Sequence, residues 1–150
     1  MISNSKTVGD VTEGQILAAL LRFGKVVLVP FGDNQRYDFV VDENGLFVRI
    51  QCKTGKLKRG AVHFSTCSSY MHRNCGKKSY LGEVEFIGVY CPQNDECYMI
   101  PIGDCPTREM SLRLEPSKNN QTKNTKNASD YEFSIILKST LWTGATAQLS

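Results

Sequence analysis

Apolar residues recur at helical spacing near the N-terminus and then alternate along several shorter segments. The first pattern predicts a helix over residues 10–23, because apolar side chains repeat every three or four positions. Asp10 and Glu13 have the spacing of a capping box at its start, and Gly24 is a suitable stop at its end. Residues 25–30 then predict a short apolar strand. The helical stripe consists of Ile16, Leu17, Leu20 and Leu21.

The clearest local prediction is a β-hairpin. Residues 37–42 and 46–54 both have strand character, and Asn44-Gly45 between them suits a two-residue turn, in which both residues adopt positive φ. With that turn, the numbers of paired residues sum to 89, which places Asp38 opposite Gln51. Side chains alternate across a strand, so one face of the hairpin is purely apolar and faces the core. That face consists of Phe39, Val41, Val48 and Ile50.

The rest of the chain predicts further strands and one polar loop. We expect strands over residues 61–64, 83–90, 96–102 and 112–114, a mobile loop over residues 117–130, and a final strand over residues 131–137 or a short helix ending near Trp142. This order predicts a single α/β domain over residues 1–150, built around one mixed sheet.

Length and composition exclude several classes of protein. The chain has 150 residues, of which 41% are hydrophobic, enough for one core. Its longest apolar runs are far shorter than the roughly 20 residues of a transmembrane helix. Residues 1–10 lack the pattern of a secretory signal, so we expect a cytoplasmic protein. The six cysteines are then expected to be reduced thiols.

The charge distribution is strongly uneven. Residues 44–82 contain no Asp or Glu and eight Lys or Arg, whereas the rest of the chain carries ten cations against fifteen acids. Such a segment attracts polyanions, although a solvated basic surface without a partner gives the same pattern. Tyr70 and Tyr80 lie in the segment as further candidate phosphate contacts. Its cations are Arg49, Lys53, Lys56, Lys58, Arg59, Arg73, Lys77 and Lys78.

The hairpin register gathers groups suited to metal-assisted hydrolysis. Asp38, Gln51 and Lys53 share its polar face, and Lys53 is the diagonal neighbour of Asp38. Carboxylate, amide and backbone oxygens suit Mg²⁺, and a lysine can offset phosphate charge. Glu13 lies on the apolar stripe of the helix, where a carboxylate needs a partner or a metal. The alternatives are a cross-strand ion pair for Asp38 and Lys53, and the capping role for Glu13.

A zinc site is a weaker possibility. Cys67, His72 and Cys75 have a C-x4-H-x2-C spacing, with Cys91 and Cys97 further along the chain. The segment lacks a C-x2-C pair, so free thiols are the favoured interpretation.

The residues gathered by the helix and the hairpin resemble the motif of the PD-(D/E)XK nuclease superfamily. The motif residues are Glu13, Tyr37-Asp38 and Gln51-Cys52-Lys53, and the resemblance covers roughly residues 10–135. The segments 82–90, 98–102 and 111–114 are most similar to a branch of cyanobacterial homing endonucleases encoded by group I introns in tRNA genes. Two positions depart from the motif: Tyr37 stands for the usual Pro, and Gln51 stands for the usual acid, which removes a negative charge from the metal site.

This resemblance implies a restriction-endonuclease-like core, a mixed β-sheet flanked by helices, with Glu13, Asp38, Gln51 and Lys53 as catalytic residues. It further implies that Asp38, Gln51, Glu13 and the backbone carbonyl of Cys52 bind Mg²⁺, for which Mn²⁺ can substitute, and that Lys53 assists the attacking water. Double-stranded DNA is the implied partner, so the protein is expected at the bacterial nucleoid when bound. The implied assembly is a homo-oligomer, a dimer or, by resemblance, a tetramer.

Three function classes remain open from the sequence. The first is a homing endonuclease that makes Mg²⁺-dependent double-strand breaks in a long target, an intron-lacking tRNA gene. The others are a restriction, repair or junction-resolving nuclease of the superfamily, and a catalytically silent DNA-binding module on the same core. The candidate DNA contacts are Arg49, Lys56, Lys58, Arg59, Arg73, Lys77 and Lys78.

Overall fold

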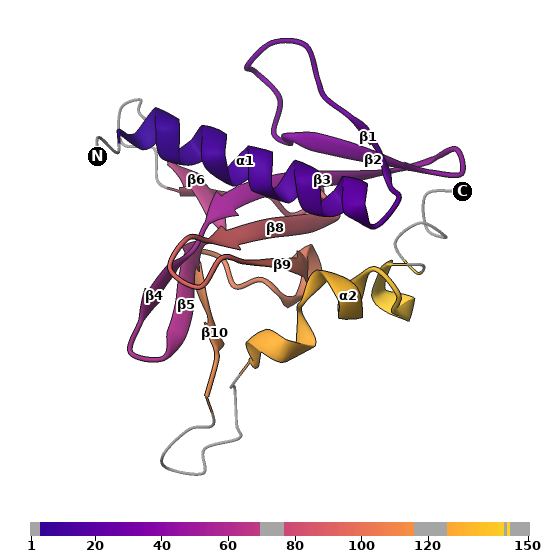
Figure 1. Ribbon diagram of the computed structural model, residues 1–150. Helices are drawn as coiled ribbons and strands as arrows, with labels where there is room; N and C mark the ends of the chain where they lie inside the picture. Colours follow the sequence, from indigo (N-terminus) through magenta and orange to yellow (C-terminus); the bar gives the residue numbers. More distant parts are fainter. Residues whose placement is uncertain (1–3, 70–76, 116–125, 143, 145–150) are drawn as a thin grey trace.

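A five-stranded mixed sheet forms the centre of the protein (Figure 1). The computed structural model describes residues 4–69, 77–115, 126–142 and 144. The sheet has the order β1-β2-β3-β8-β9, in which β3 and β8 are parallel and the other neighbours are antiparallel. This is the mixed α/β architecture that the sequence predicts. The strands are β1 (Val26–Leu28), β2 (Phe39–Glu43), β3 (Leu46–Thr54), β8 (Phe86–Cys91) and β9 (Glu96–Pro101).

Helix α1 (Ser5–Arg22) crosses one face of this sheet and begins earlier than predicted. Its N-cap is Asn4, whose side chain accepts a hydrogen bond from the backbone N–H of Thr7 at 2.7 Å. The predicted capping box of Asp10 and Glu13 is therefore wrong, because both residues lie inside the helix. The apolar stripe marks only the part of the helix that packs on the sheet, so it could not mark the first turns.

The β2–β3 hairpin has the predicted turn and register. Asn44 and Gly45 have φ of 57° and 91°, and the ladder pairs Phe39 with Ile50 through Glu43 with Leu46. The predicted apolar face is buried, and Gly88 of β8 extends it. A Cβ on Gly88 would lie 3.3 Å from Ile50 and 3.4 Å from Ile16 of α1, so the helix packs closely on the sheet here.

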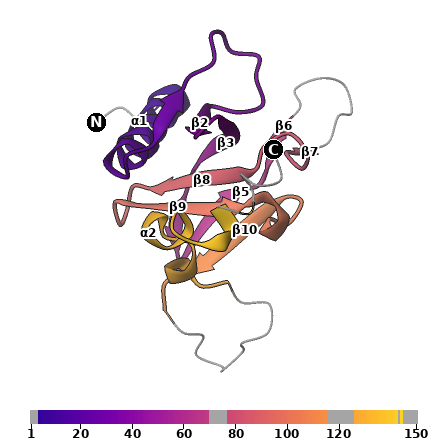
Figure 2. The same cartoon turned by 90° about the vertical axis from the view of Figure 1, so that its right-hand side faces the viewer.

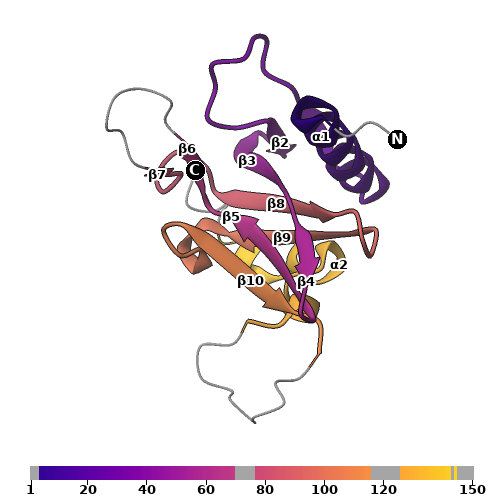
Figure 3. The same ribbon diagram turned by 90° about the vertical axis from the view of Figure 1, so that its left-hand side faces the viewer.

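A second, three-stranded sheet extends below the first and is seen from another side in Figure 3. It has the order β10-β5-β4, with β4 (Lys56–Lys58), β5 (Ala61–Ser65) and β10 (Glu109–Arg113). The turn between β4 and β5 is Arg59-Gly60, again with positive φ at both residues, 52° and 73°. The sequence indicated only the β5 part of this hairpin, because Arg at the first turn position is not a turn signal. Strands β6 (Cys67–Ser69) and β7 (Lys77–Ser79) form a separate antiparallel pair.

The C-terminal segment is helical, so the strand alternative for residues 131–137 is wrong. After the 3-10 turns η1 (Ile102–Asp104) and η2 (Ala128–Asp130), α2 (Phe133–Ile136) packs beside β9, as Figure 2 shows. Trp142 is 1% exposed and packs on Phe86 with ring centroids 4.9 Å apart. Most of the predicted mobile loop of residues 117–130, namely residues 117–125, lies outside the described residues. No helix in the described part of the chain is long and apolar enough to cross a membrane.

Candidate active site

Two carboxyl groups meet where α1 passes the start of β2. Glu13 is held there by its helix, since Ile16 one turn later packs under Gly88 and the Thr12 hydroxyl is 2.6 Å from that of Thr54. Asp38 directly precedes β2, and its carboxyl hydrogen-bonds that of Glu13. Glu13 therefore takes part in the site rather than in a capping box.

Asp38 departs from the predicted strand pairing. The ladder stops at Phe39–Ile50, so the expected Asp38–Gln51 pair does not form. Instead, the Asp38 backbone N–H donates to the carbonyl of Ile50 at 2.8 Å, and its Oδ2 accepts from the backbone N–H of Cys52 at 2.9 Å. The Asp38 carboxylate thus takes the place of a backbone acceptor at the end of the ladder. This bond holds the carboxylate beside Gln51-Cys52-Lys53 on β3.

The pKa values of both carboxyl groups are raised. Burial and the neighbouring Asp38 raise the pKa of Glu13 to about 7. Burial also raises the pKa of Asp38, although the N–H of Cys52, the hydrogen bond with Glu13 and the charge of Lys53 oppose it. The pair therefore retains a proton near neutral pH, which is the electrostatic situation that a bound cation relieves.

A cleft opens beside the carboxyl pair. It has a volume of about 450 Å³, and Glu13 and Asp38 form one wall. The loop between β1 and β2 forms the other wall, with Val29, Pro30, Gly32, Asp33, Gln35 and Tyr37 lining it. Tyr37, which stands at the usual Pro position of the motif, thus borders the entrance. The two acids are accessible from outside the protein.

The third motif position presents an amide rather than an acid. Gln51 is half-buried on β3, and its Nε2 donates to the backbone carbonyl of Cys52 at 3.3 Å. Within the described residues, no three His, Cys, Asp or Glu side chains form a metal-binding group. An ion at this site therefore requires backbone or amide oxygens in addition to Glu13 and Asp38. Such all-oxygen donors fit Mg²⁺ or Mn²⁺.

Lys53 is the motif lysine, and it lies close enough to Asp38 to lower the pKa of that carboxyl. Its Nζ donates to the backbone carbonyl of Cys67 at 3.1 Å and lies 4.9 Å from the centroid of the Tyr80 ring. The structure thus brings Glu13, Asp38 and Lys53 together, and Gln51 lies two residues before Lys53 on β3. Tyr80 is only 4% exposed, so the sequence-based suggestion that it contacts phosphate is wrong.

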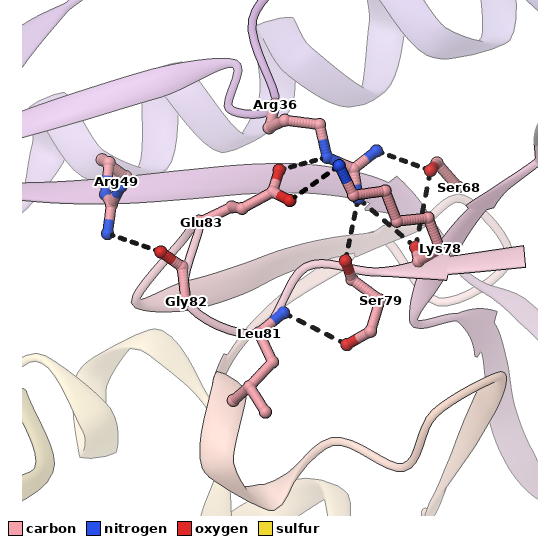
Figure 4. A network of polar contacts seen from close by, with 8 residues as sticks. All are labelled: Arg36, Arg49, Ser68, Lys78, Ser79, Leu81, Gly82 and Glu83. Atoms are coloured by element: carbon pink, nitrogen blue, oxygen red, sulfur yellow. Dashed lines mark hydrogen bonds and ion pairs between the residues drawn. The ribbon is translucent and has the colours of Figure 1, made fainter.

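Arg36 is a central residue of this region that was not among the site residues predicted from the sequence (Figure 4). Its Nε pairs with Glu83 at 2.5 Å, and its other nitrogens donate to the Ser68 hydroxyl and to the carbonyls of Lys78 and Ser79. The guanidinium also stacks on Tyr80, with Cζ 4.0 Å from the ring centroid. Arg36 therefore joins the loop before Asp38 to β6 and β7. An arginine in a polar loop carries no periodicity that reveals such contacts.

The basic segment divides into paired and unpaired cations. Arg49 forms a two-pronged ion pair with Glu85, its NH2 group 2.5 Å from Oε2, and Lys78 pairs with Glu83 at 3.1 Å. The acids that neutralise them, Glu83 and Glu85, lie just past the acid-free segment. The charge of the segment counted from the sequence is therefore larger than the unpaired charge in the structure. Arg73 and the side chain of Lys77 lie outside the described residues. Three exposed cations form no ion pair with a described acid: Lys56, Lys58 and Arg59.

The cysteines that the structure describes are free thiols: Cys52, Cys67, Cys91, Cys97 and Cys105. Three members of the suggested zinc cluster belong to this set. Its other two members, His72 and Cys75, lie outside the described residues.

Comparison with known proteins connects this geometry to one family. Among curated proteins, none matches the sequence. The fold is similar to that of a solved bacterial homing endonuclease, I-Ssp6803I, with a TM-score of 0.76, 21% identity, and 99% of this chain and 100% of that chain covered. A family model described as PD-(D/E)XK endonuclease matches residues 3–134. The resemblance inferred from the motif residues is therefore confirmed, and the chain belongs to the PD-(D/E)XK endonuclease family.

Proposed function

We propose that this protein is a site-specific homing endonuclease that makes Mg²⁺-dependent double-strand breaks in DNA at a long target, an intron-lacking tRNA gene. The observation that carries the proposal is the hydrogen-bonded pair of Glu13 and Asp38, with Lys53 close enough to act on the Asp38 carboxyl. Two acids at the edge of a cleft, with a lysine near one of them, are the groups that phosphodiester hydrolysis requires. The similarity to a homing endonuclease supports the choice within the family.

The metal ligands in this proposal are oxygen atoms. Asp38 and Glu13 would supply carboxylates, Cys52 its backbone carbonyl, and Gln51 its amide oxygen, while the Gln51 amide nitrogen donates to the Cys52 carbonyl in this structure. When bound, Mg²⁺ or Mn²⁺ polarises the phosphate and lowers the pKa of a water. The raised pKa of Glu13 supports a cation here, because a divalent ion would offset the same negative charge that the retained proton offsets.

The protein's own groups supply orientation and charge. Lys53 extends from β3 on the side of Asp38, where its ammonium offsets the negative charge that develops on the phosphate in the transition state. The exposed cations of the β4–β5 hairpin, Lys56, Lys58 and Arg59, continue the same chain segment and are suited to the DNA backbone. Cutting both strands of a duplex requires two such sites, which favours a homodimer or homotetramer.

The bond from Gln51 to the Cys52 carbonyl favours a second candidate function. The Gln51 amide donates to the same carbonyl that the proposal assigns to the metal. If the amide stays there in the presence of metal, the domain is a silent DNA-binding module. Activity assays separate the two candidates directly.

The test is cleavage of a supercoiled plasmid that carries an intron-lacking cyanobacterial tRNA gene, in Mg²⁺ and in EDTA. We expect one Mg²⁺-dependent double-strand cut, and a loss of at least roughly 100-fold in Lys53→Ala. Lys138→Ala is the matched control, because Lys138 is an exposed lysine just past α2, remote from β3. Full cleavage by Lys53→Ala contradicts the site assignment. Salt-sensitive DNA binding without cleavage supports the silent module.

A further inference from the structure

Tyr80 lies under two cations at once. Its ring is 4.0 Å from Cζ of Arg36 and 4.9 Å from Nζ of Lys53, measured to the ring centroid, and the residue is 4% exposed. Both distances are within the range of cation–π contacts, which strengthen when the partners are shielded from water. Tyr80 follows β7 and precedes the turn into β8, so it comes to Lys53 from a different part of the chain.

The contact matters because a lysine side chain is otherwise poorly fixed. Four side-chain torsions separate its ammonium from the backbone, and fixing them costs conformational entropy. At Lys53, two groups suppress it: the carbonyl of Cys67, which accepts from Nζ at 3.1 Å, and the Tyr80 ring. The Cys67 carbonyl holds the Lys53 ammonium close to β6, and the Tyr80 ring covers one side of the ammonium.

Arg36 explains how the ring itself is held. Its guanidinium is fixed by Glu83, by the Ser68 hydroxyl and by the carbonyl of Ser79, so the stacked plane has a defined place. Two cations near one ring repel each other, but the carboxylate of Glu83 offsets the charge of Arg36. The ring is thereby left available to attract the ammonium of Lys53.

We propose that Tyr80 is a positioning residue for the Lys53 ammonium, held in place by the stacked guanidinium of Arg36. The proposal rests on the proposed function, since Lys53 is its catalytic lysine. Tyr80 acts through its aromatic face and touches neither metal nor DNA. Removing the ring therefore lowers the rate of strand cleavage without weakening DNA binding.

The chain offers well-matched variants for a test. Tyr80→Phe keeps the aromatic face, and Tyr80→Leu keeps a buried apolar side chain without it. Tyr131→Leu is the control for the loss of a buried tyrosine, because Tyr131 is 5% exposed and its hydroxyl bonds Asp104, beside α2. We expect single-turnover cleavage to fall by roughly 10-fold or more in Tyr80→Leu and by less than about 2-fold in the other two variants. Affinity for DNA in EDTA stays within about 2-fold in all three variants.

A second readout does not depend on cleavage. Lysines are converted to ¹³C-dimethyl-lysines, and the Lys53 signal is assigned by its absence in Lys53→Arg. A ring over the ammonium shifts the methyl resonance upfield. We expect this shift in the wild type and in Tyr80→Phe, and its loss in Tyr80→Leu.

Each combination of results has one meaning. The upfield shift together with a rate loss confined to Tyr80→Leu supports the proposal. Equal rates in Tyr80→Leu and wild type overturn it, as do equal losses in Tyr80→Leu and Tyr131→Leu, because the role is then only structural. A missing shift in the wild type also overturns it. A wild type that shows the shift but cleaves no DNA refutes the proposed nuclease, while the contact itself stands demonstrated.

Discussion

The carboxyl of Glu13, on α1, hydrogen-bonds the carboxyl of Asp38, which lies just before β2, and the pKa of Glu13 is raised to about 7. The two residues are far apart in the sequence and come together because α1 packs across the central sheet. Asp38 then bonds the backbone of β3 through its side chain. The free-energy cost of placing two acids together can be measured as a pH dependence of stability in EDTA.

Glu13→Gln is expected to stabilise the metal-free protein above pH 7. The pKa of Glu13 is about 7 when folded and 4.5 as an ordinary carboxyl, so the folded state holds the extra proton. The stability that this proton provides is complete below pH 4.5 and is lost as the pH rises to 7. After solvent screening, we expect the variant to gain about 1 kcal/mol at pH 8 and little at pH 4.

Thermal unfolding in EDTA at both pH values checks this. The control is Glu109→Gln, which neutralises an exposed acid on β10. A gain of equal size at pH 4 and pH 8 contradicts the raised pKa.

The central elements could be predicted from the sequence because their signals are local. The Asn44-Gly45 turn sets the register of β2 and β3, and the alternation of apolar residues sets which face is buried. The Asp38–Gln51 pair could not be judged this way. This pair does not form because the Asp38 side chain competes with backbone acceptors at the end of the strand. Such competition does not change the alternation of apolar and polar residues, so the sequence pattern does not reveal it.

Gln51→Glu is expected to retain cleavage and to bind metal more tightly. The variant restores the acid that the motif usually has, but it replaces the amide donor to the Cys52 carbonyl with a further carboxyl group in a region where Glu13 and Asp38 already retain a proton. The metal-free protein is therefore destabilised, and Mg²⁺ raises its melting temperature more than it does in the wild type. Gln93→Glu, at the turn after β8, is the control. Complete loss of cleavage in Gln51→Glu contradicts a ligand role for this position and shows that the amide itself is required.

Arg59 and Arg49 are expected to differ in DNA binding although both lie in the basic segment. Arg59 is exposed and forms no ion pair with a described acid, so Arg59→Asn lowers the slope of log affinity against log salt by about 1. Asn also tolerates the φ of 52° at this turn position. Arg49 is engaged by Glu85, so Arg49→Gln changes the slope little and lowers stability instead. DNA titrations at several salt concentrations give the slopes, and an equal effect of the two variants contradicts the assignment.

The contacts around Lys53 mark the limit of prediction from sequence. Lys53 follows from the motif, yet Tyr80 contacts it from a segment after β7, and Arg36 contacts Tyr80 from a loop before β2. Both contacts depend on where three segments cross in space. Charge counting also misled here, since Glu83 and Glu85 pair with Lys78 and Arg49 of the segment that contains no acid.

Gly55→Ala is expected to destabilise the protein by about 2 kcal/mol through overpacking. Gly55 lies between β3 and β4, where the chain leaves the central sheet two residues after Lys53, and its N–H donates to the Tyr90 carbonyl at 2.7 Å. A Cβ there would lie 2.6 Å from Cγ1 of Val62 and 3.0 Å from Cγ1 of Val89, both of them fully buried.

The matched control is Gly9→Ala in α1, where an added Cβ meets no described atom within 4 Å. Because alanine favours a helix over glycine, we expect this variant to gain about 0.5–1 kcal/mol. The double variant Gly55→Ala/Val62→Ala opens space for the new methyl group, so it loses less stability than the two single losses together. Urea unfolding of the wild type, Gly55→Ala, Val62→Ala, the double variant and Gly9→Ala measures these differences. A neutral Gly55→Ala, or strictly additive losses in the double variant, contradicts the close packing at the point where the motif strand turns into the second sheet.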